Sequence, residues 1–149
     1  MKSLIFLTSI VWCLILLFGC SASRPKNLGA AGGRLVPCPH SPNCVSTQAV
    51  DDVHKIAPFS YTSTKEQAMD RLVAVINSMP RTRIVTRTDT YLYVEFTTAL
   101  MRYVDDVEFC LNDEKKTIDF RSASRIGYGD MGVNRKRMEE VSRRFMAEK

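Results

Sequence analysis

The stretch VEFCLNDEKKTIDF, residues 107–120, decides the fold because it holds two short strands and the turn that joins them. Apolar side chains occupy every second position on either side of the turn NDEKK: Val107, Phe109, Leu111, Ile118 and Phe120. Successive side chains of a strand point to opposite faces of a sheet, so this alternation predicts one buried face and one polar face. The sequence therefore predicts an antiparallel hairpin.

The register of this hairpin follows because both apolar sets must face one core. A slip of one residue would turn a whole set outward. The predicted pairs are Leu111 with Ile118 and Phe109 with Phe120. The same register places Glu108 opposite Arg121 on the polar face, where an opposite-charge pair contributes roughly 0.2–1 kcal/mol.

The residues upstream extend this sheet. Residues 83–88 and 91–98 are rich in β-branched and aromatic side chains, and the Asp-Thr pair between them indicates a second hairpin. Residues 56–62 predict one more strand. Between these strands lies a helix that a capping box opens, formed by Ser63 with Glu66 or by Thr64 with Gln67, and that Pro80 closes.

A last helix, with Asn134 as its N-cap, runs to about Met146. The predicted order is β-α-β-β-β-β-α. This order indicates an α+β fold, in which an antiparallel sheet carries two helices packed on one face.

The N-terminus has the features of an export signal. Lys2 precedes an apolar run over residues 4–18, and small residues follow. Leu17-Phe18-Gly19-Cys20 resembles the lipobox of bacterial lipoproteins, in which the cysteine receives acyl chains such as palmitate and becomes the first mature residue. An ordinary secretory signal cut near Ser21 is the alternative.

These features divide the chain into three parts. We expect residues 1–19 to be a lipoprotein-type signal peptide, residues 20–36 to be a flexible tether rich in Gly, Ala and Ser, and residues 37–149 to form one α+β domain. With acyl chains on Cys20 the protein would be anchored in the cell envelope. In a Gram-negative organism, Ser21 after the cysteine indicates the periplasmic side of the outer membrane.

The charge of the chain limits the classes of partner. The formal net charge is +5 at pH 7, which is compatible with anionic headgroups and with other polyanions. We do not expect nucleic acid as the partner of an exported protein. The expected partners are the membrane, through the lipid, and either an envelope protein or a small anion.

Two cysteines close the short loop CPHSPNC, residues 38–44. Outside the cytoplasm, a disulfide between Cys38 and Cys44 is the expected outcome. A metal site built from both thiolates with His40 and His54 is the alternative, but the spacing is unusual for zinc, and we expect no metal. Cys110 remains as an unpaired thiol on a strand.

The segment GYGDMG, residues 127–132, matches the glycine pattern of a dinucleotide-binding loop. That fingerprint requires a parallel βαβ unit with a further strand after the helix, and here the helix is the last element. We therefore reject a nucleotide site and expect no cofactor. The glycines allow a sharp turn from a strand into the last helix.

The residues around this loop form the candidate ligand-binding set. Arginine forks, hydroxyls and a helix N-terminus can hold a carboxylate or a phosphate. The candidates are Arg121, Ser122, Ser124, Arg125, Asp130, Asn134, Arg135, Asp106 and Glu108. In the alternative that we prefer, Arg125 or Arg135 pairs with Asp105, Asp106 or Asp130 and locks the loop onto the sheet.

Three stretches together resemble the family known as domain of unknown function 1499, which occurs in bacterial envelopes and in plastids. They are CPHSPNCVSTQA at 38–49, YLYVEFTT with DDVEF across 91–109, and RSASRIGYGDMGVNRKRME at 121–139. The matching positions are Cys38, Pro42, Asn43, Cys44, Asp106, Glu108, Arg121, Ser122, Ser124, Arg125, Gly127, Tyr128, Asp130, Gly132, Asn134 and Arg135. The resemblance supports the domain limits and implies no reaction.

The sequence contains no catalytic motif, so we lean against an enzyme and predict no catalytic residues. We expect a membrane-tethered envelope lipoprotein with a binding or accessory domain of unknown ligand. A small-anion receptor or an enzyme that uses the segment 121–137 is the alternative.

Overall fold

The computed structural model describes residues 22–147 of the chain, and the proposed signal peptide with Cys20 lies outside these described residues. The described part is an α+β fold in the order β-β-α-β-β-β-β-α. The strands are β1 (Cys44–Ser46), β2 (Phe59–Ser60), β3 (Thr82–Arg87), β4 (Tyr91–Thr97), β5 (Val104–Asn112) and β6 (Thr117–Ser124). The helices are α2 (Lys65–Asn77) and α3 (Val133–Ala147).

The six strands form one antiparallel sheet in the order β1-β6-β5-β4-β3. Strands β1 and β2 both pair with β6, β1 near its C-terminal end and β2 at its N-terminal end. The predicted fold class is confirmed, with one strand more than the sequence indicates. The additional strand, β1, has only three residues, which is too short to carry a recognisable alternation. In the described residues neither helix is long and apolar enough to cross a membrane.

The predicted hairpin register is confirmed between β5 and β6, where Phe109 lies opposite Phe120 and Glu108 lies opposite Arg121. The hairpin between β3 and β4 also forms. Helix α2 begins after Thr64, whose capping box with Gln67 is the second of the two that the sequence offers. The helix ends at Asn77, three residues before the predicted Pro80.

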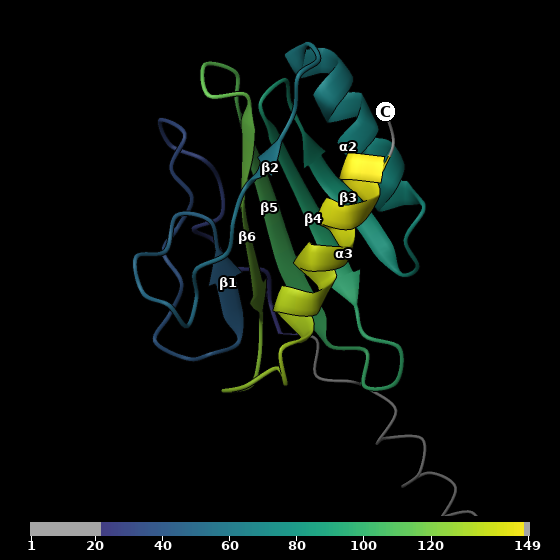
Figure 1. The fold of residues 1–149 in the computed structure, drawn as a ribbon. Coiled ribbons are helices and arrows are strands. Elements are labelled where there is room, and N and C mark those ends of the chain that lie inside the picture. The colour runs from purple at the N-terminus through teal and green to yellow at the C-terminus, as the bar shows by residue number, and fades with distance from the viewer. Residues whose placement is uncertain (1–21, 148–149) are drawn as a thin grey trace, which may run out of the picture.

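Both helices cover one face of the sheet, as predicted (Figure 1). The hydrophobic core between the sheet and the two helices is almost fully closed to solvent. It is formed by alternate strand residues and by one stripe of each helix. Its largest buried members include Phe59, Leu72, Ile76, Leu92, Phe109, Ile118, Phe120, Met138 and Phe145. The Phe59 ring lies 4.8 Å from the Phe120 ring and 5.8 Å from the Phe145 ring, so β2, β6 and α3 meet at one aromatic contact.

The opposite face of the sheet is polar, and the N-terminal part of the described chain runs across it. Arg24 binds Glu95 on β4, the Gly29 amide donates to Glu108 on β5, and Leu35 reaches Gln48 beyond β1. The segment that the sequence predicts to be a tether, residues 20–36, therefore contacts the domain from Arg24 to Leu35. The segment therefore lies against two charged side chains of the sheet, Glu95 and Glu108.

Candidate functional site

The predicted ligand-binding residues do not form one site, because they lie on both faces of the sheet. Successive residues of a strand point to opposite faces. Arg121 of β6 and Arg125, the first residue after β6, share the polar face with Asp106 and Glu108 of β5. Ser122 and Ser124 instead face α3, with Asn134 and Asp130. Arg135 lies apart from both groups and donates to the carbonyls of Val53 and Lys55.

Arg125 is the centre of the ion-pair network on the polar face. Its Nε lies 2.9 Å and 3.1 Å from the two oxygens of Asp106, and its Nη2 donates to Asp106, to Tyr93 and to Glu95. Only 7% of the Arg125 side chain is exposed. The pKa of Arg125 is raised mainly by its hydrogen bonds to Asp106, so the guanidinium remains charged. The predicted lock between Arg125 and Asp106 is therefore present.

Glu95 collects further cations at the edge of this network. Its carboxylate accepts hydrogen bonds from Arg24, Arg83 and Arg125. Burial by itself raises the pKa of Glu95, but the three guanidinium groups outweigh it and lower the pKa to about 2. Tyr93 lies between Glu95 and Asp106, and its hydroxyl is 2.5 Å from Asp106 Oδ1. Burial and this hydrogen bond raise the pKa of Tyr93, so its hydroxyl remains a donor.

The second group on the polar face surrounds Glu108, which is fully buried. Its Oε1 accepts from the Tyr91 hydroxyl and from the Gly29 amide, both at 2.7 Å. The Arg121 Nη1 lies 3.6 Å from Glu108 Oε2, which is an ion-pair distance but not a hydrogen bond. Within the described part of the chain, Glu108 Oε2 and Arg121 Nε have no hydrogen-bond partner. Burial lowers the pKa of Arg121, although Glu108 opposes this effect.

The helix-facing residues form a separate network beneath α3. Arg137 Nη2 lies 2.5 Å from Asp105 Oδ2, and its Nη1 donates to the side-chain oxygen of Asn134 at 2.9 Å. The side-chain amide of Asn134 donates to Ser124 Oγ at 3.0 Å and to the Asn43 carbonyl at 3.1 Å. Asn134 is fully buried, so this network joins the loop before β1, strand β6 and helix α3 through one side chain.

The segment GYGDMG connects β6 to α3 as predicted, but the helix cap differs from the prediction. Gly127 and Gly132 have φ values of 87° and 76°, a conformation that favours glycine. Asp130 accepts from the Gly132 amide at 2.9 Å and from the Asn134 amide at 2.8 Å, so Asp130 caps α3 and Asn134 lies in its first turn. Burial raises the pKa of Asp130, but these amide hydrogen bonds lower it overall.

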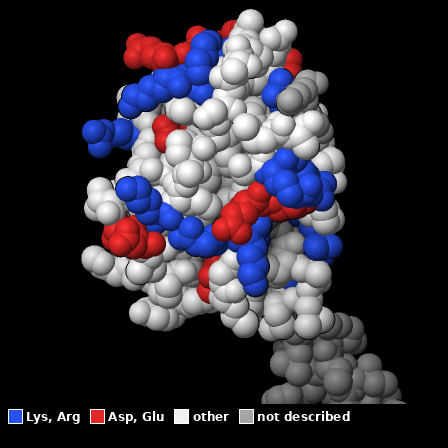
Figure 2. Space-filling model, viewed as in Figure 1, with Lys and Arg blue, Asp and Glu red and all other residues white. Residues whose placement is uncertain are grey.

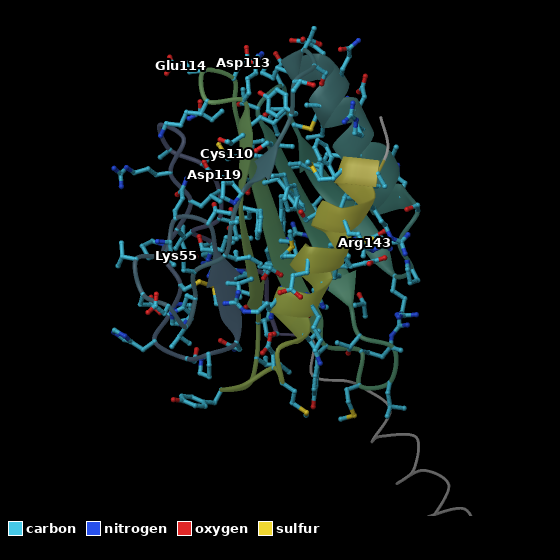
Figure 3. All side chains as sticks on the ribbon, in the orientation of Figure 1. Lys55, Cys110, Asp113, Glu114, Asp119 and Arg143 are labelled. Carbon is cyan, nitrogen blue, oxygen red and sulfur yellow. A yellow bond between two sulfur atoms is a disulfide. The ribbon has the colours of Figure 1, made fainter. Side chains whose placement is uncertain are left out.

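Cys38 and Cys44 form a disulfide, with their Cα atoms 5.7 Å apart. The two sulfurs are therefore not available as thiolates for the alternative metal site. His54 instead contacts Asp51 Oδ1 at 2.7 Å and the Ser41 carbonyl at 3.1 Å, which ties the segment after β1 to the disulfide loop. Cys110 is a buried free thiol, opposite Asp119 of β6 (Figure 3), and burial raises its pKa.

An apolar hollow of about 460 Å³, which the sequence alone did not predict, lies beside the glycine segment. The loop between β4 and β5 contributes Leu100, Met101 and Tyr103, the loop before α3 contributes Met131, and α3 contributes its first residue, Val133. The signal was present in the sequence as two large apolar residues within a hairpin loop, where polar turn residues are usual. The hollow requires both loops, so its assembly depends on tertiary structure.

The fold and these contacts define a disulfide-containing α+β domain in which arginine–carboxylate networks lie on both faces of an antiparallel sheet. The family model described as Protein of unknown function (DUF1499) matches residues 34–145, most of the chain. The chain belongs to this family. No curated protein matches it.

Proposed function

We propose that the protein is a membrane-tethered lipoprotein of the cell envelope, whose α+β domain is a binding or accessory module and not a catalyst. The observation that carries the second half of this proposal is the internal pairing of the arginines in segment 121–137. Arg125 and Arg137 have only 7% and 10% of their side chains exposed, and both are bound to carboxylates.

These arginines are poor candidates for ligand capture because a ligand anion would have to displace a carboxylate that the fold already holds. Removing one partner from a buried ion pair is costly, roughly 3–5 kcal/mol. The network has a clear structural use in place of ligand binding. It joins β4 and β5 to the residue that follows β6 on one face, and it fixes α3 to the sheet on the other.

The membrane anchor in this proposal is supported by the sequence Leu17-Phe18-Gly19-Cys20. Its test is Cys20→Ser in the full chain, expressed in a bacterial host that processes lipoproteins, with Cys110→Ser as the matched cysteine control. We expect Cys20→Ser to lose the mass of the acyl chains and to leave the membrane fraction, while Cys110→Ser keeps both. Membrane association that is unchanged in Cys20→Ser would refute the anchor.

A small-anion receptor at Arg121 is the second candidate, and a specific observation favours it. Arg121 is almost buried, lies near a buried carboxylate, and its Nε has no hydrogen-bond partner among the described residues. Titration calorimetry with inorganic phosphate and with acetate tests this candidate. Saturable binding that Arg121→Met abolishes and Arg143→Met preserves would establish the receptor in place of the accessory module.

A further inference from the structure

One end of the molecule exposes large apolar side chains that the core does not use. Leu100 is 88% exposed and Met101 is 56% exposed in the loop between β4 and β5, and Met131 is 96% exposed before α3. The three side chains line the same apolar hollow, so they form one surface and not scattered positions. We call this surface the apolar end, defined by Leu100, Met101 and Met131.

The apolar end is a candidate contact surface because adjacent exposed apolar side chains in a folded protein usually indicate an interaction site. The loops that carry it, residues 98–103 and 125–132, contain one carboxylate, Asp130. That carboxylate is occupied by the amides of Gly132 and Asn134. On the face seen in Figure 2, this lower end of the molecule is mainly uncharged.

Basic side chains lie beside the apolar end. Arg102 is exposed at the tip of the loop between β4 and β5, and Arg81 is exposed next to the end of β4, where its Nε donates to the Thr97 carbonyl. Apolar side chains next to exposed guanidinium groups match the interface of a phospholipid bilayer, which presents phosphates above acyl chains.

The position at which the described chain begins favours the bilayer, where the proposed lipid anchor would lie, as the occupant. Arg24 is bound to Glu95, two residues from the end of β4 and therefore close to the apolar end. Cys20 precedes Arg24 by four residues, and four residues of extended chain span at most roughly 14 Å. In Figure 1 the described chain starts at the same lower end as the two loops, and the hairpin between β5 and β6 lies at the opposite end.

We propose that the apolar end docks on the phospholipid bilayer and that Leu100, Met101 and Met131 insert into its interfacial region. This inference rests on the proposed lipid anchor at Cys20. The contacts of Arg24 with Glu95 and of Gly29 with Glu108 keep the connection short, so the domain does not hang freely from the lipid. Docking orients the sheet along the membrane normal and leaves the hairpin at residues 113–116 farthest from the lipid.

The experiment uses an introduced tryptophan as a depth probe in the lipidated full chain. The only native tryptophan, Trp12, lies in the predicted signal peptide, so the mature chain contributes no tryptophan fluorescence of its own. Leu100→Trp and Met131→Trp place the probe at the apolar end. Glu114→Trp is the matched control, because Glu114 is also exposed and lies in the hairpin at the other end of β5 (Figure 3). Each variant is reconstituted into phosphatidylcholine–phosphatidylglycerol vesicles with and without brominated acyl chains.

We expect brominated lipid to quench the probes at positions 100 and 131 several-fold more strongly than the probe at 114. All three substitutions are at exposed positions, and matching thermal melts with the unsubstituted chain verify the fold. If the chain floats with the vesicles and no probe is quenched, the anchor stands and the docking is refuted. If the chain does not float, the anchor itself fails and the docking fails with it. Equal quenching at all three positions also overturns the proposal.

Discussion

Replacing Arg125 by alanine removes the cation at the centre of the polar-face network. The lost contacts are the two-oxygen contact with Asp106, at 2.9 Å and 3.1 Å, the hydrogen bond to Tyr93 at 3.0 Å, and the ion pair with Glu95. Asp106 is 2% exposed at its side chain and would remain buried without this cation. Leaving a buried charge uncompensated typically destabilises a protein by about 3–5 kcal/mol. Glu95 keeps Arg24 and Arg83, so we expect about 3 kcal/mol.

Urea unfolding at pH 7, followed by circular dichroism, measures this free-energy difference. The matched control is Arg143→Ala, because among residues 22–147 Arg143 pairs only with Glu140, on the exposed side of α3 (Figure 3). Exposed ion pairs contribute little to stability, so the control is expected to unfold close to the wild-type midpoint. Both variants remove one arginine, and the comparison separates the buried network from the net charge.

A double variant gives the sharper test of the reasoning. If Arg125 stabilises the fold by neutralising Asp106, then Arg125→Ala combined with Asp106→Ala costs clearly less than the sum of the two single changes. The account is wrong if Arg125→Ala shifts the midpoint no more than Arg143→Ala does. It is also wrong if the effects of the two network changes simply add. Either result would make Arg125 a candidate for ligand binding again.

Three further predictions concern other parts of the fold. The pKa of Glu95 is lowered to about 2 from an ordinary value of 4.5, so its contribution to stability is present above pH 4.5 and is lost as the pH falls toward 2. Glu95→Gln should therefore reduce the loss of unfolding free energy between pH 4.5 and pH 2. An unchanged loss in this pH range would contradict the assignment. Reducing the Cys38–Cys44 disulfide opens a short loop and should cost about 2 kcal/mol of unfolding free energy; urea titration with and without reductant measures it, and equal midpoints would count against the estimate. Asp130→Ala removes the cap of α3 and should cost about 0.5–2 kcal/mol, whereas Asp130→Asn should restore most of that loss.

The sheet was predictable because its information is local and periodic. The alternation over residues 107–120 determined both the hairpin and its register, including Glu108 opposite Arg121. Strand β1 was not predictable in the same way. Its three residues pair with Arg121, Ser122 and Ala123, which lie more than 70 positions away in the sequence, and no local pattern specifies such a contact.

The candidate site was predicted as one cluster, and strand geometry alone separates it into two. Arg121 and Ser122 are neighbours in sequence and therefore point to opposite faces of β6. The same alternation that predicted the core could have made this separation. The helix cap failed for another reason: Asp130 and Asn134 are both good capping residues, and the turn through Gly132 decides between them.

The contacts of residues 24–35 could not be read from composition. The segment is rich in glycine and alanine and has no apolar periodicity, which is typical of a flexible linker. Its contacts with the sheet come from one guanidinium, Arg24, and one backbone amide, Gly29, and their partners Glu95 and Glu108 lie on distant strands. A buried carboxylate needs hydrogen-bond donors, and a backbone amide can supply one whatever side chain its residue carries.

The central claim is that the arginines of segment 121–137 act within the fold and do not form a ligand site. The most direct measurement is a ¹⁵N–¹H NMR spectrum of the arginine Nε–H groups at pH 7, during a titration with inorganic phosphate. The account predicts that the Arg125 Nε–H, which donates to both oxygens of Asp106, gives a resonance that exchanges slowly with water and does not move with phosphate. A saturable shift of the Arg125 resonance, absent from the exposed Arg143, would contradict it.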